Sequence, residues 1–386
     1  IVPAAPCHAG AVQRPTVAVP LQFCWQSPPG GTGRAAIELT GSLARLGLAE
    51  VVGVVPGTGA PTQGFEPAVA TARVPRSPWP PMSAPLLNSA WQRLGWPPIE
   101  AAVAGAGYGP VDLVHLMAPI VPRRGRVPLV ATLHDVFPLR FPGSFSKRGV
   151  SVMSRGLSLL ARRAALVACS SEATAADAVD AGFDGARLRV IPLGVAAAPL
   201  PDDAVATVRR RYSLQRPYII SVGTLEPRKN LASLLPLGAE LDRRGVDLVL
   251  VGPSGWADVA SSVARASSVR WLGFVPTADR DALLAGAEVA AQPSLAEGFG
   301  LPVLEAMARG TAVVTSATTS TAEVAGDTGV LVDPTNPGEV QAAVLDLLDD
   351  PDRAALLGEA GRRRSAEFTW ERCARAHAAM YAELLG

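Results

Sequence analysis

The sequence contains no apolar run long enough to cross a membrane, although 48% of its 386 residues are hydrophobic. Its four cysteines, Cys7, Cys24, Cys169 and Cys373, have neither the spacing of a disulfide framework nor that of a zinc motif. The four histidines do not cluster with them, which argues against a zinc site. The first residues lack the cationic and apolar regions of a signal peptide. We therefore expect reduced thiols and a cytoplasmic location.

Lysine is almost absent, because only Lys147 and Lys229 occur among the 35 basic residues. The net charge of +1 hides an asymmetry: residues 1–195 carry 17 basic and 10 acidic side chains, and the remainder carries 18 and 24. Such a division suggests a different partner for each half, and drift in an arginine-rich composition explains it equally well. No aromatic-rich basic stripe or known binding module indicates a nucleic-acid partner.

What the sequence does contain is a strand–helix alternation that runs through two successive halves. This pattern predicts parallel sheets covered by helices on both faces. The expected fold class is α/β, with two Rossmann-like domains at residues 1–195 and 196–368 that face one another across a cleft. Residues 56–98 are rich in proline and glycine, so we expect a long and partly irregular excursion there. Strands are expected at 16–23, 51–55, 111–116, 129–133, 165–169, 189–191, 218–222, 247–251, 269–271, 289–292 and 312–315, and helices at 33–46, 171–181, 231–243, 278–284, 301–308 and 370–385.

Two adjacent cations, Arg228 and Lys229, follow the predicted strand 218–222 and precede a predicted helix start near Asn230. A helix start after a strand is a favourable position for an anion. A solvated surface pair is the simpler explanation for two cations. Lysine is so rare here that its use beside an arginine indicates a need for a compact point charge, as in phosphate binding.

Two glutamates eight positions apart, Glu297 and Glu305, bracket a glycine-containing turn. Pro302 suits the first turn of a helix that begins at Leu301, so the amides of residues 299–301 are expected to point toward an anion. An ordinary helix-capping arrangement is the alternative. Together with the cation pair, the segment suits a sugar joined to a diphosphate, with carboxylates for hydroxyls and cations and amides for phosphates.

Other patterns have simpler explanations. Gly31–Ala36 formally matches a dinucleotide fingerprint, but Pro56 follows the second strand where an acidic residue is required. The strings Asp279-Arg280-Asp281 and Asp350-Pro351-Asp352 match the metal-binding pattern Asp-x-Asp, yet both lie at predicted helix starts, where aspartate caps are ordinary. No metal ion and no cofactor other than the donor substrate is expected.

These segments resemble the donor site of the retaining GT-B glycosyltransferases of the large Glu-x7-Glu family, family 4, which includes sucrose synthases and bacterial mannosyltransferases. The resemblance covers essentially the whole chain. It extends to the glycine loop Pro29-Gly30-Gly31, the histidine segment Thr132-Leu133-His134-Asp135, the interdomain turn 190–195 and the segment Phe368-Thr369-Trp370. It implies the GT-B fold, with residues 369–386 forming a helix that packs back on the first domain.

The resemblance also implies roles for individual residues. Glu297 faces the donor sugar and Glu305 the nucleotide ribose, while Arg228 and Lys229 hold the diphosphate. His134 lies near the reacting sugar, and Gly31 offers an amide to the phosphates. One position departs from the family, because Thr224 stands where many relatives carry arginine. The predicted catalytic residues are His134, Arg228, Lys229 and Glu297, and the predicted substrate-binding residues are Gly30, Gly31, Gly298, Phe299, Gly300, Leu301 and Glu305.

The expected function is transfer of a sugar, with retention and without a metal, from a nucleotide-diphosphate sugar to a hydroxyl of a glycan, glycolipid or small molecule. Resemblance to mannosyltransferases favours GDP-mannose as the donor. A GT-B epimerase, hydrolase or phosphorylase and a noncatalytic donor-binding subunit remain alternatives. A basic surface in the first half suggests peripheral contact with an anionic membrane. Its residues are Arg123, Arg124, Arg126, Lys147, Arg148, Arg155, Arg162 and Arg163. The simpler alternative is a helix whose apolar face is buried and whose arginines are solvated.

Overall fold

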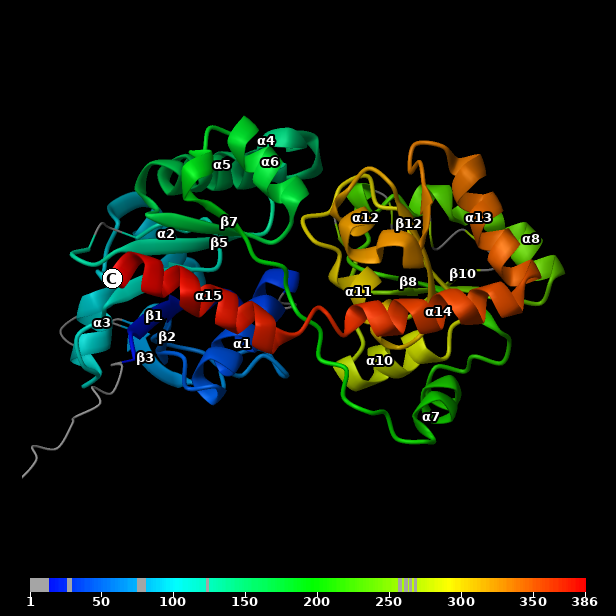
Figure 1. Ribbon diagram of the computed structural model, residues 1–386, viewed down its shortest axis with the longest axis horizontal. Helices are drawn as coiled ribbons and strands as arrows, with labels where there is room; N and C mark the ends of the chain where they lie inside the picture. Colours follow the sequence, from blue (N-terminus) through cyan, green and yellow to red (C-terminus); the bar gives the residue numbers. More distant parts are fainter. Residues whose placement is uncertain are drawn as a thin grey trace, which may run out of the picture.

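The computed structural model describes residues 14–25, 30–74, 81–122, 125–255, 259, 263, 266 and 269–386. Two α/β units lie side by side, and each is built on one sheet (Figure 1). Every strand pair in the described part of the chain is parallel. The predicted α/β class with two Rossmann-like units is therefore confirmed.

The first sheet contains seven strands in the order β3-β2-β1-β4-β5-β6-β7 among the described residues. Its strand β1 (Thr16–Pro20) is buried throughout, as expected for a strand with helices on both faces. β1 pairs with β4 on one side and β2 on the other, so the strand order reverses there. Ligands of open parallel sheets bind beyond the carboxyl ends of strands at such a reversal. The remaining strands are β2 (Glu50–Pro56), β3 (Ala70–Val74), β4 (Leu113–Leu116), β5 (Leu129–Leu133), β6 (Leu166–Cys169) and β7 (Leu188–Val190).

Serine side chains begin two helices of the first unit. Ser146 Oγ accepts a hydrogen bond from the amide of Gly149 at 3.1 Å, and Ser171 Oγ accepts one from the amide of Thr174 at 3.0 Å. Each of these bonds satisfies an amide that the helix itself cannot pair. The helices of this unit are α1 (Gly31–Arg45), α2 (Ala84–Leu94), α3 (Ile99–Gly105), α4 (Phe137–Arg140), α5 (Lys147–Arg163) and α6 (Glu172–Asp180).

The second sheet has six strands in the order β10-β9-β8-β11-β12-β13 among the described residues, and its order reverses between β8 and β11. The cation pair follows β8 and the glutamate segment follows β11, so both lie at the reversal. The strands are β8 (Tyr218–Val222), β9 (Asp247–Val251), β10 (Val269–Trp271), β11 (Val289–Gln292), β12 (Ala312–Ser316) and β13 (Val330–Val332). The helices are α7 (Ala204–Arg211), α8 (Gly238–Arg243), α10 (Thr277–Ala285), α11 (Leu301–Ala308), α12 (Ser320–Ala325), α13 (Pro337–Asp349) and α14 (Pro351–Ser365).

The last helix, α15 (Trp370–Leu385), leaves the second unit and packs against the first, where it lies along α1 (Figure 1). Its side chains Trp370, Cys373 and Tyr381 are buried in a hydrophobic cluster that contains residues of both units. Two segments connect the units, one after β7 and one before α15. They are hydrogen-bonded to each other, because the amide of Val195 donates to the carbonyl of Phe368 at 2.9 Å.

Two expectations about local structure were wrong. The first strand ends at Pro20 rather than at residue 23. Residues 231–243 do not form one helix, because Pro236 lies within them and has no N–H to donate within a helix. Short 3₁₀ turns occupy 231–237, and only α8 is helical. The excursion 56–98 is partly irregular, as expected, and it also contains the edge strand β3 and helix α2, while residues 75–80 lie outside the described part.

Candidate active site

The carboxyl ends of both sheets meet at one cleft with a volume of about 450 Å³. Residues from both units line it, and all eleven predicted catalytic and substrate-binding residues are among them. Pro29, which the sequence pattern includes in the glycine loop, lies outside the described residues. Position in the cleft is thus established for the whole predicted set, and the role of each residue toward a ligand stays a prediction.

A buried ionic cluster centres on Glu297. One carboxylate oxygen accepts a hydrogen bond from Arg228 at 3.0 Å, and the other is paired with the Lys229 ammonium. Ser294 Oγ donates to that second oxygen at 3.0 Å. Burial alone would raise the pKa of Glu297, but the nearby Lys229 and Arg228 outweigh burial and lower it to about 2. The carboxylate is therefore ionised at any physiological pH.

The 3₁₀ turn Pro227–Lys229 brings both cations into this cluster. Asn230 ends the turn in its left-handed conformation. Its side-chain nitrogen Nδ2 anchors the turn by donating to the carbonyls of Pro293 at 3.0 Å and Pro334 at 2.7 Å. Arg228 is also paired with Glu226, and its guanidinium lies 4.9 Å from the centre of the Phe137 ring, which belongs to the first unit. The cations are thus held rigidly and balanced by two carboxylates.

Glu305 lies one turn inside α11 and is 7% exposed. Its carboxylate contacts Arg280 Nη2 at 3.3 Å and Arg34 Nε at 3.5 Å. Arg34 comes from the other unit and also donates to Thr277 Oγ1 at 3.5 Å. Neither arginine was singled out from the sequence as a site residue. Arg34 was visible only within a glycine-rich string, and no local pattern pairs Arg280 with a glutamate 25 positions away.

The glycine loop and the start of α11 face each other across the cleft. A Cβ atom placed on Gly31 would lie 3.8 Å from Leu301 Cδ1, so a larger side chain would enter the space between them. Gly300 precedes α11 with φ 102°, a backbone conformation that L side chains rarely adopt. Two helix N-termini, those of α1 and α11, therefore open on the same cleft, and helix N-termini attract anions.

His134 follows β5 and lines the cleft. Burial lowers the pKa of His134 to about 4, with a smaller contribution from the neighbouring His377. The imidazole is therefore neutral at pH 7, and its Nε2 has no hydrogen-bond partner among the described residues. A neutral imidazole with an unpaired nitrogen can exchange a hydrogen bond with a sugar hydroxyl without adding charge to the site.

A buried polar network behind His134 connects the first sheet to α15. His115 contacts Tyr381 Oη at 2.8 Å through Nδ1 and Thr132 Oγ1 at 2.8 Å through Nε2. His377 Nε2 lies 3.2 Å from the same Thr132 oxygen. Burial lowers the pKa values of His115 and His377, so both are neutral. His115 is therefore engaged in structural contacts behind the cleft.

The two Asp-x-Asp strings are engaged in structural contacts. Asp279 accepts hydrogen bonds from Arg211 at 2.6 Å and Tyr212 at 2.7 Å, and Asp281 is paired with Arg309 at 2.7 Å. Asp350 caps α14 by accepting from the amide of Arg353 at 3.0 Å. The expected capping role is thus correct for Asp350, whereas Asp279 and Asp281 act as ion-pair partners.

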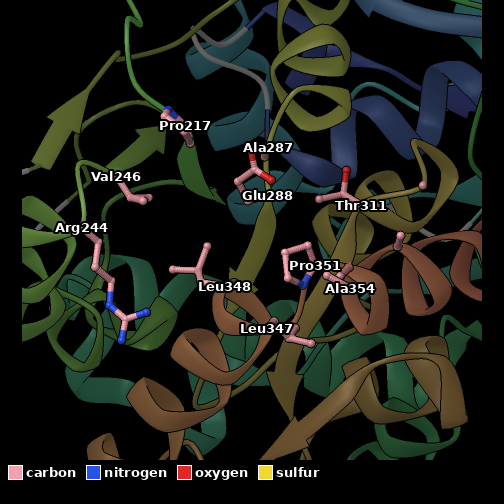
Figure 2. Close-up of a pocket in the computed structure, with 13 residues that line it drawn as sticks. Pro217, Arg244, Val246, Ala287, Glu288, Thr311, Leu347, Leu348, Pro351 and Ala354 are labelled. Atoms are coloured by element: carbon pink, nitrogen blue, oxygen red, sulfur yellow. The ribbon is translucent and has the colours of Figure 1, made fainter.

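A second hollow, of about 520 Å³, lies at the amino-terminal ends of the strands of the second sheet (Figure 2). Its wall includes residues that precede strands, among them Pro217 before β8 and Thr311 before β12. Arg244 on its rim is paired with Glu240 at 2.6 Å and with Asp349. Ligands of parallel sheets bind at the other ends of the strands. The interdomain cleft is therefore the candidate active site.

Comparison with known families matches both units of the chain. Residues 29–198 match the family model "Glycosyltransferase Family 4", and residues 208–364 match "Glycosyl transferases group 1". Among curated proteins, the chain is 31% identical over 256 residues to the O-antigen chain mannosyltransferase B of Escherichia coli. That alignment covers 63% of this chain and 67% of the relative.

Two further relatives are mycobacterial. The chain is 36% identical over 222 residues to the MMP alpha-(1->4)-mannosyltransferase of Mycolicibacterium hassiacum, which covers 55% of this chain and 52% of that protein. It is 36% identical over 220 residues to the GDP-mannose-dependent alpha-(1-6)-phosphatidylinositol monomannoside mannosyltransferase of Mycolicibacterium smegmatis, with 52% and 56% covered. The alignments thus span about half the length of each of these two relatives.

Solved structures share the fold over nearly the full length. The sucrose-phosphate synthase of Thermosynechococcus elongatus superposes with a TM-score of 0.77 at 22% identity, covering 96% of this chain and 99% of that one. An Anabaena protein solved in complex with UDP and glucose superposes with a TM-score of 0.74 at 20% identity, covering 96% and 100%. At these identities the likeness concerns the fold. With both family models and the Escherichia coli relative, it establishes that the chain belongs to glycosyltransferase family 4 and is a glycosyltransferase of the GT-B fold.

Proposed function

We propose that this glycosyltransferase moves a hexose from a nucleotide-diphosphate sugar to an acceptor hydroxyl, with retention of configuration and with GDP-mannose as the preferred donor. The observation that carries the proposal is the buried Glu297 held between Arg228 and Lys229 at the strand reversal of the second sheet. The preference for mannose rests on the three relatives, which are named as mannosyltransferases, one of them as GDP-mannose-dependent.

In the proposed reaction, the bond between the anomeric carbon and the diphosphate oxygen breaks, and the acceptor oxygen bonds to the same face of that carbon. The acceptor proton passes to the departing phosphate. Lys229 and Arg228, with the amides at the start of α11, stabilise the charge that develops on the leaving group. Because both cations are preorganised by Glu297, they need little rearrangement when that charge appears.

The state of the cleft carboxylates supports retention. Glu226, Glu297 and Glu305 are each held in ion pairs, and the fourth carboxylate lining the described cleft, Asp135, accepts a hydrogen bond from the amide of Phe137 at 3.0 Å. Direct displacement with inversion requires a base that removes the acceptor proton on the far side of the sugar. The three carboxylates bound to arginine or lysine are poor candidates for that base. Asp135, which is in no ion pair with a described residue and whose pKa is raised by burial, is the one other candidate among the described cleft carboxylates, and a β-linked product would point to it.

Calorimetry of the purified chain against a panel of nucleotide sugars tests the donor, and the anomeric configuration of the product, read by proton NMR, tests the stereochemistry. We expect the tightest binding from GDP-mannose and an α-linked product. A β-linked product would overturn retention. Release of free mannose regardless of acceptor would favour a hydrolase, and donor binding without any turnover would favour a noncatalytic subunit.

We also propose that the reaction needs neither a metal nor a further cofactor, because Arg228 and Lys229 can supply the charge that a divalent ion provides elsewhere. Turnover is expected to persist after dialysis against EDTA, within about twofold of the untreated enzyme. Complete loss that Mg²⁺ or Mn²⁺ restores would show that a metal, and not the cation pair alone, neutralises the leaving group.

The acceptor side of the first unit supports a proposal of peripheral contact with an anionic membrane. A hollow of about 280 Å³ there is lined by Arg93, Arg148 and Arg155, none of which is ion-paired with a described residue. The apolar face of α5 is occupied, since Leu157 and Leu160 are buried in the core. The proposed contact is therefore electrostatic. Arg123 and Arg124 lie outside the described residues, and no helix in the described part of the chain is long and apolar enough to span a membrane.

Cosedimentation with anionic vesicles is expected at low salt and should weaken near physiological ionic strength, as exposed charges become screened. Replacing Arg148 and Arg155 with glutamine should weaken it further, whereas Arg353→Gln, an exposed position on α14, should leave it unchanged. Equal sedimentation with neutral vesicles, or none with either kind, would contradict membrane contact and leave a soluble acceptor.

A further inference from the structure

The first turn of α6 makes direct contact with the donor-side loop of the second unit. Three of its hydroxyls, those of Ser170, Ser171 and Thr174, donate to the carbonyl oxygen of Gly298 at 2.9, 2.8 and 2.8 Å. A carbonyl oxygen has two lone pairs, so the three hydroxyls share one acceptor. Gly298 adjoins Glu297, which organises the cations. This hydroxyl cluster, Ser170, Ser171 and Thr174, therefore binds the first unit to the donor-side loop of the second unit.

Two members of the hydroxyl cluster have a second acceptor within their own unit. The carbonyl oxygen of His134 lies 3.3 Å from Ser170 Oγ and 3.2 Å from Thr174 Oγ1. A hydroxyl donates one hydrogen bond at a time and rotates to suit its acceptor. When the units separate, both hydroxyls can turn from Gly298 to His134. Opening then leaves neither of these buried donors unsatisfied, which is the main penalty for breaking such a contact.

The approach of the two units here depends on the absence of a side chain at residue 298. A Cβ atom on Gly298 would overlap the carbonyl oxygen of His134, which is rigid backbone. Gly298 is not one of the glycines with positive φ, so its own conformation does not require glycine. Glycine is required at residue 298 only because the backbone of the first unit lies so close to it.

A carboxylate completes the contact. Glu323, on α12, accepts hydrogen bonds from the amides of Glu172 at 2.9 Å and Ala173 at 2.7 Å. These amides belong to the start of α6, where a negative charge is stabilised by unpaired N–H groups. α6 and α12 face each other across the boundary between the units (Figure 1). One helix end thus carries hydroxyl and amide contacts that join the two units.

From this geometry we propose that Ser170 and Thr174 are positioning residues for sugar transfer. Their hydroxyls exchange the carbonyl of His134 for that of Gly298 when the cleft closes, and this exchange sets the separation between His134 and Glu297. The inference rests on the proposed transfer reaction at this cleft. It adds a closing step governed by residues that were not predicted as catalytic or substrate-binding.

The test compares Thr174→Val, Ser170→Ala and the double variant with Thr174→Ser, which keeps the hydroxyl. Thr40→Val is the matched control, since Thr40 is a buried threonine whose hydroxyl donates to Ala36 within its own helix. We expect the double variant to lose about tenfold or more in kcat, from one or two hydrogen bonds of ordinary strength. Its affinity for the nucleotide should stay within about threefold of wild type, and Thr174→Ser should retain activity.

Hydrogen exchange of the segment 170–175 provides a readout independent of turnover, because the amides of Glu172 and Ala173 are protected by Glu323 only in the closed form. The double variant should exchange faster there, and Thr40→Val should not. Wild-type kcat with unchanged exchange in the double variant would overturn the proposal. A loss of kcat in Thr40→Val equal to that in the double variant would overturn it as well. Failure of wild type to transfer any sugar would defeat the proposed function, while the exchange data would still report on closure.

Gly298→Ala tests the same step from the other side. The added methyl group should hold the units apart, lower kcat by about a hundredfold or more, and speed exchange at residues 172 and 173. Gly105→Ala is the control, because a Cβ on Gly105 would meet nothing within 4 Å. Normal turnover by Gly298→Ala would show that the close approach to His134 is not needed, and the proposal would fall.

Discussion

Replacement of Lys229 by alanine is expected to lower kcat by about 10²–10³ while leaving the fold intact, since removal of one preorganised charge contact typically has an effect of this size. The Lys229 side chain is 10% exposed and is paired with Glu297, so water cannot replace its ammonium group fully. Steady-state kinetics with saturating donor and acceptor measure the loss. Thermal denaturation checks that the variant remains folded.

The chain offers an unusually clean control, because Lys147 is its only other lysine and is exposed at the start of α5. Lys147→Ala should behave like wild type in the same assay. Arginine should not substitute well at position 229, since a Cβ on Gly223 would already lie 3.1 Å from Lys229 Cε and the site is tightly packed. Turnover within a few-fold of wild type in Lys229→Ala would remove this residue from the leaving-group site.

Replacement of Glu297 by glutamine should have a similar effect on kcat, about 10²–10³, for a different reason. The amide keeps the shape and the acceptor oxygen but removes the negative charge that holds Arg228 and Lys229 together. Because neighbouring cations lower the pKa of Glu297 to about 2, the wild-type carboxylate stays ionised above pH 4, and its titration should not shape the pH–rate profile of wild type. Comparison of the profiles of both proteins between pH 5 and 9 checks this.

Removal of one member of a buried ion pair also destabilises proteins, by about 3–5 kcal/mol in typical cases. The Tm of Glu297→Gln must therefore be measured beside its kcat. Glu359→Gln is the matched control, because Glu359 pairs with Arg362 and Arg363 on the exposed side of α14. Near-normal kcat in a folded Glu297→Gln protein would contradict the assignment of this carboxylate to the site.

The parts of the structure that were predictable from the sequence are those determined by local patterns. Strand β8 and helix α11 have the predicted bounds, because a short apolar run and a proline at the first helical turn define them. The convergence of the cation pair and the glutamate segment followed from their positions after two strands of one parallel sheet. The break of the helix expected at 231–243 could have been inferred locally, because Pro236 lies inside that range and has no N–H to donate within a helix.

The candidate site was predictable as a set of residues but not as a network. Sequence reasoning assigned the cations to a diphosphate and Glu297 to a sugar, whereas in the structure these groups bind one another. The contacts of Glu305 with Arg34 and Arg280 and the hydroxyl cluster of α6 join residues separated by 25 to 271 positions. Such contacts arise from how the two units face each other, and this orientation leaves no periodic signal along the chain.

The returning helix α15 has a mechanical consequence for the molecule. The chain crosses between the units twice, and the two crossings lie against each other at Val195 and Phe368. Gly194 permits this contact, since a Cβ there would overlap the backbone at Trp370. A single tether would allow the units to swivel in any direction. Two adjoining tethers restrict the relative orientation of the units more than a single tether would. The last residues of the chain, although far in sequence from the cleft, therefore help to keep its two walls aligned.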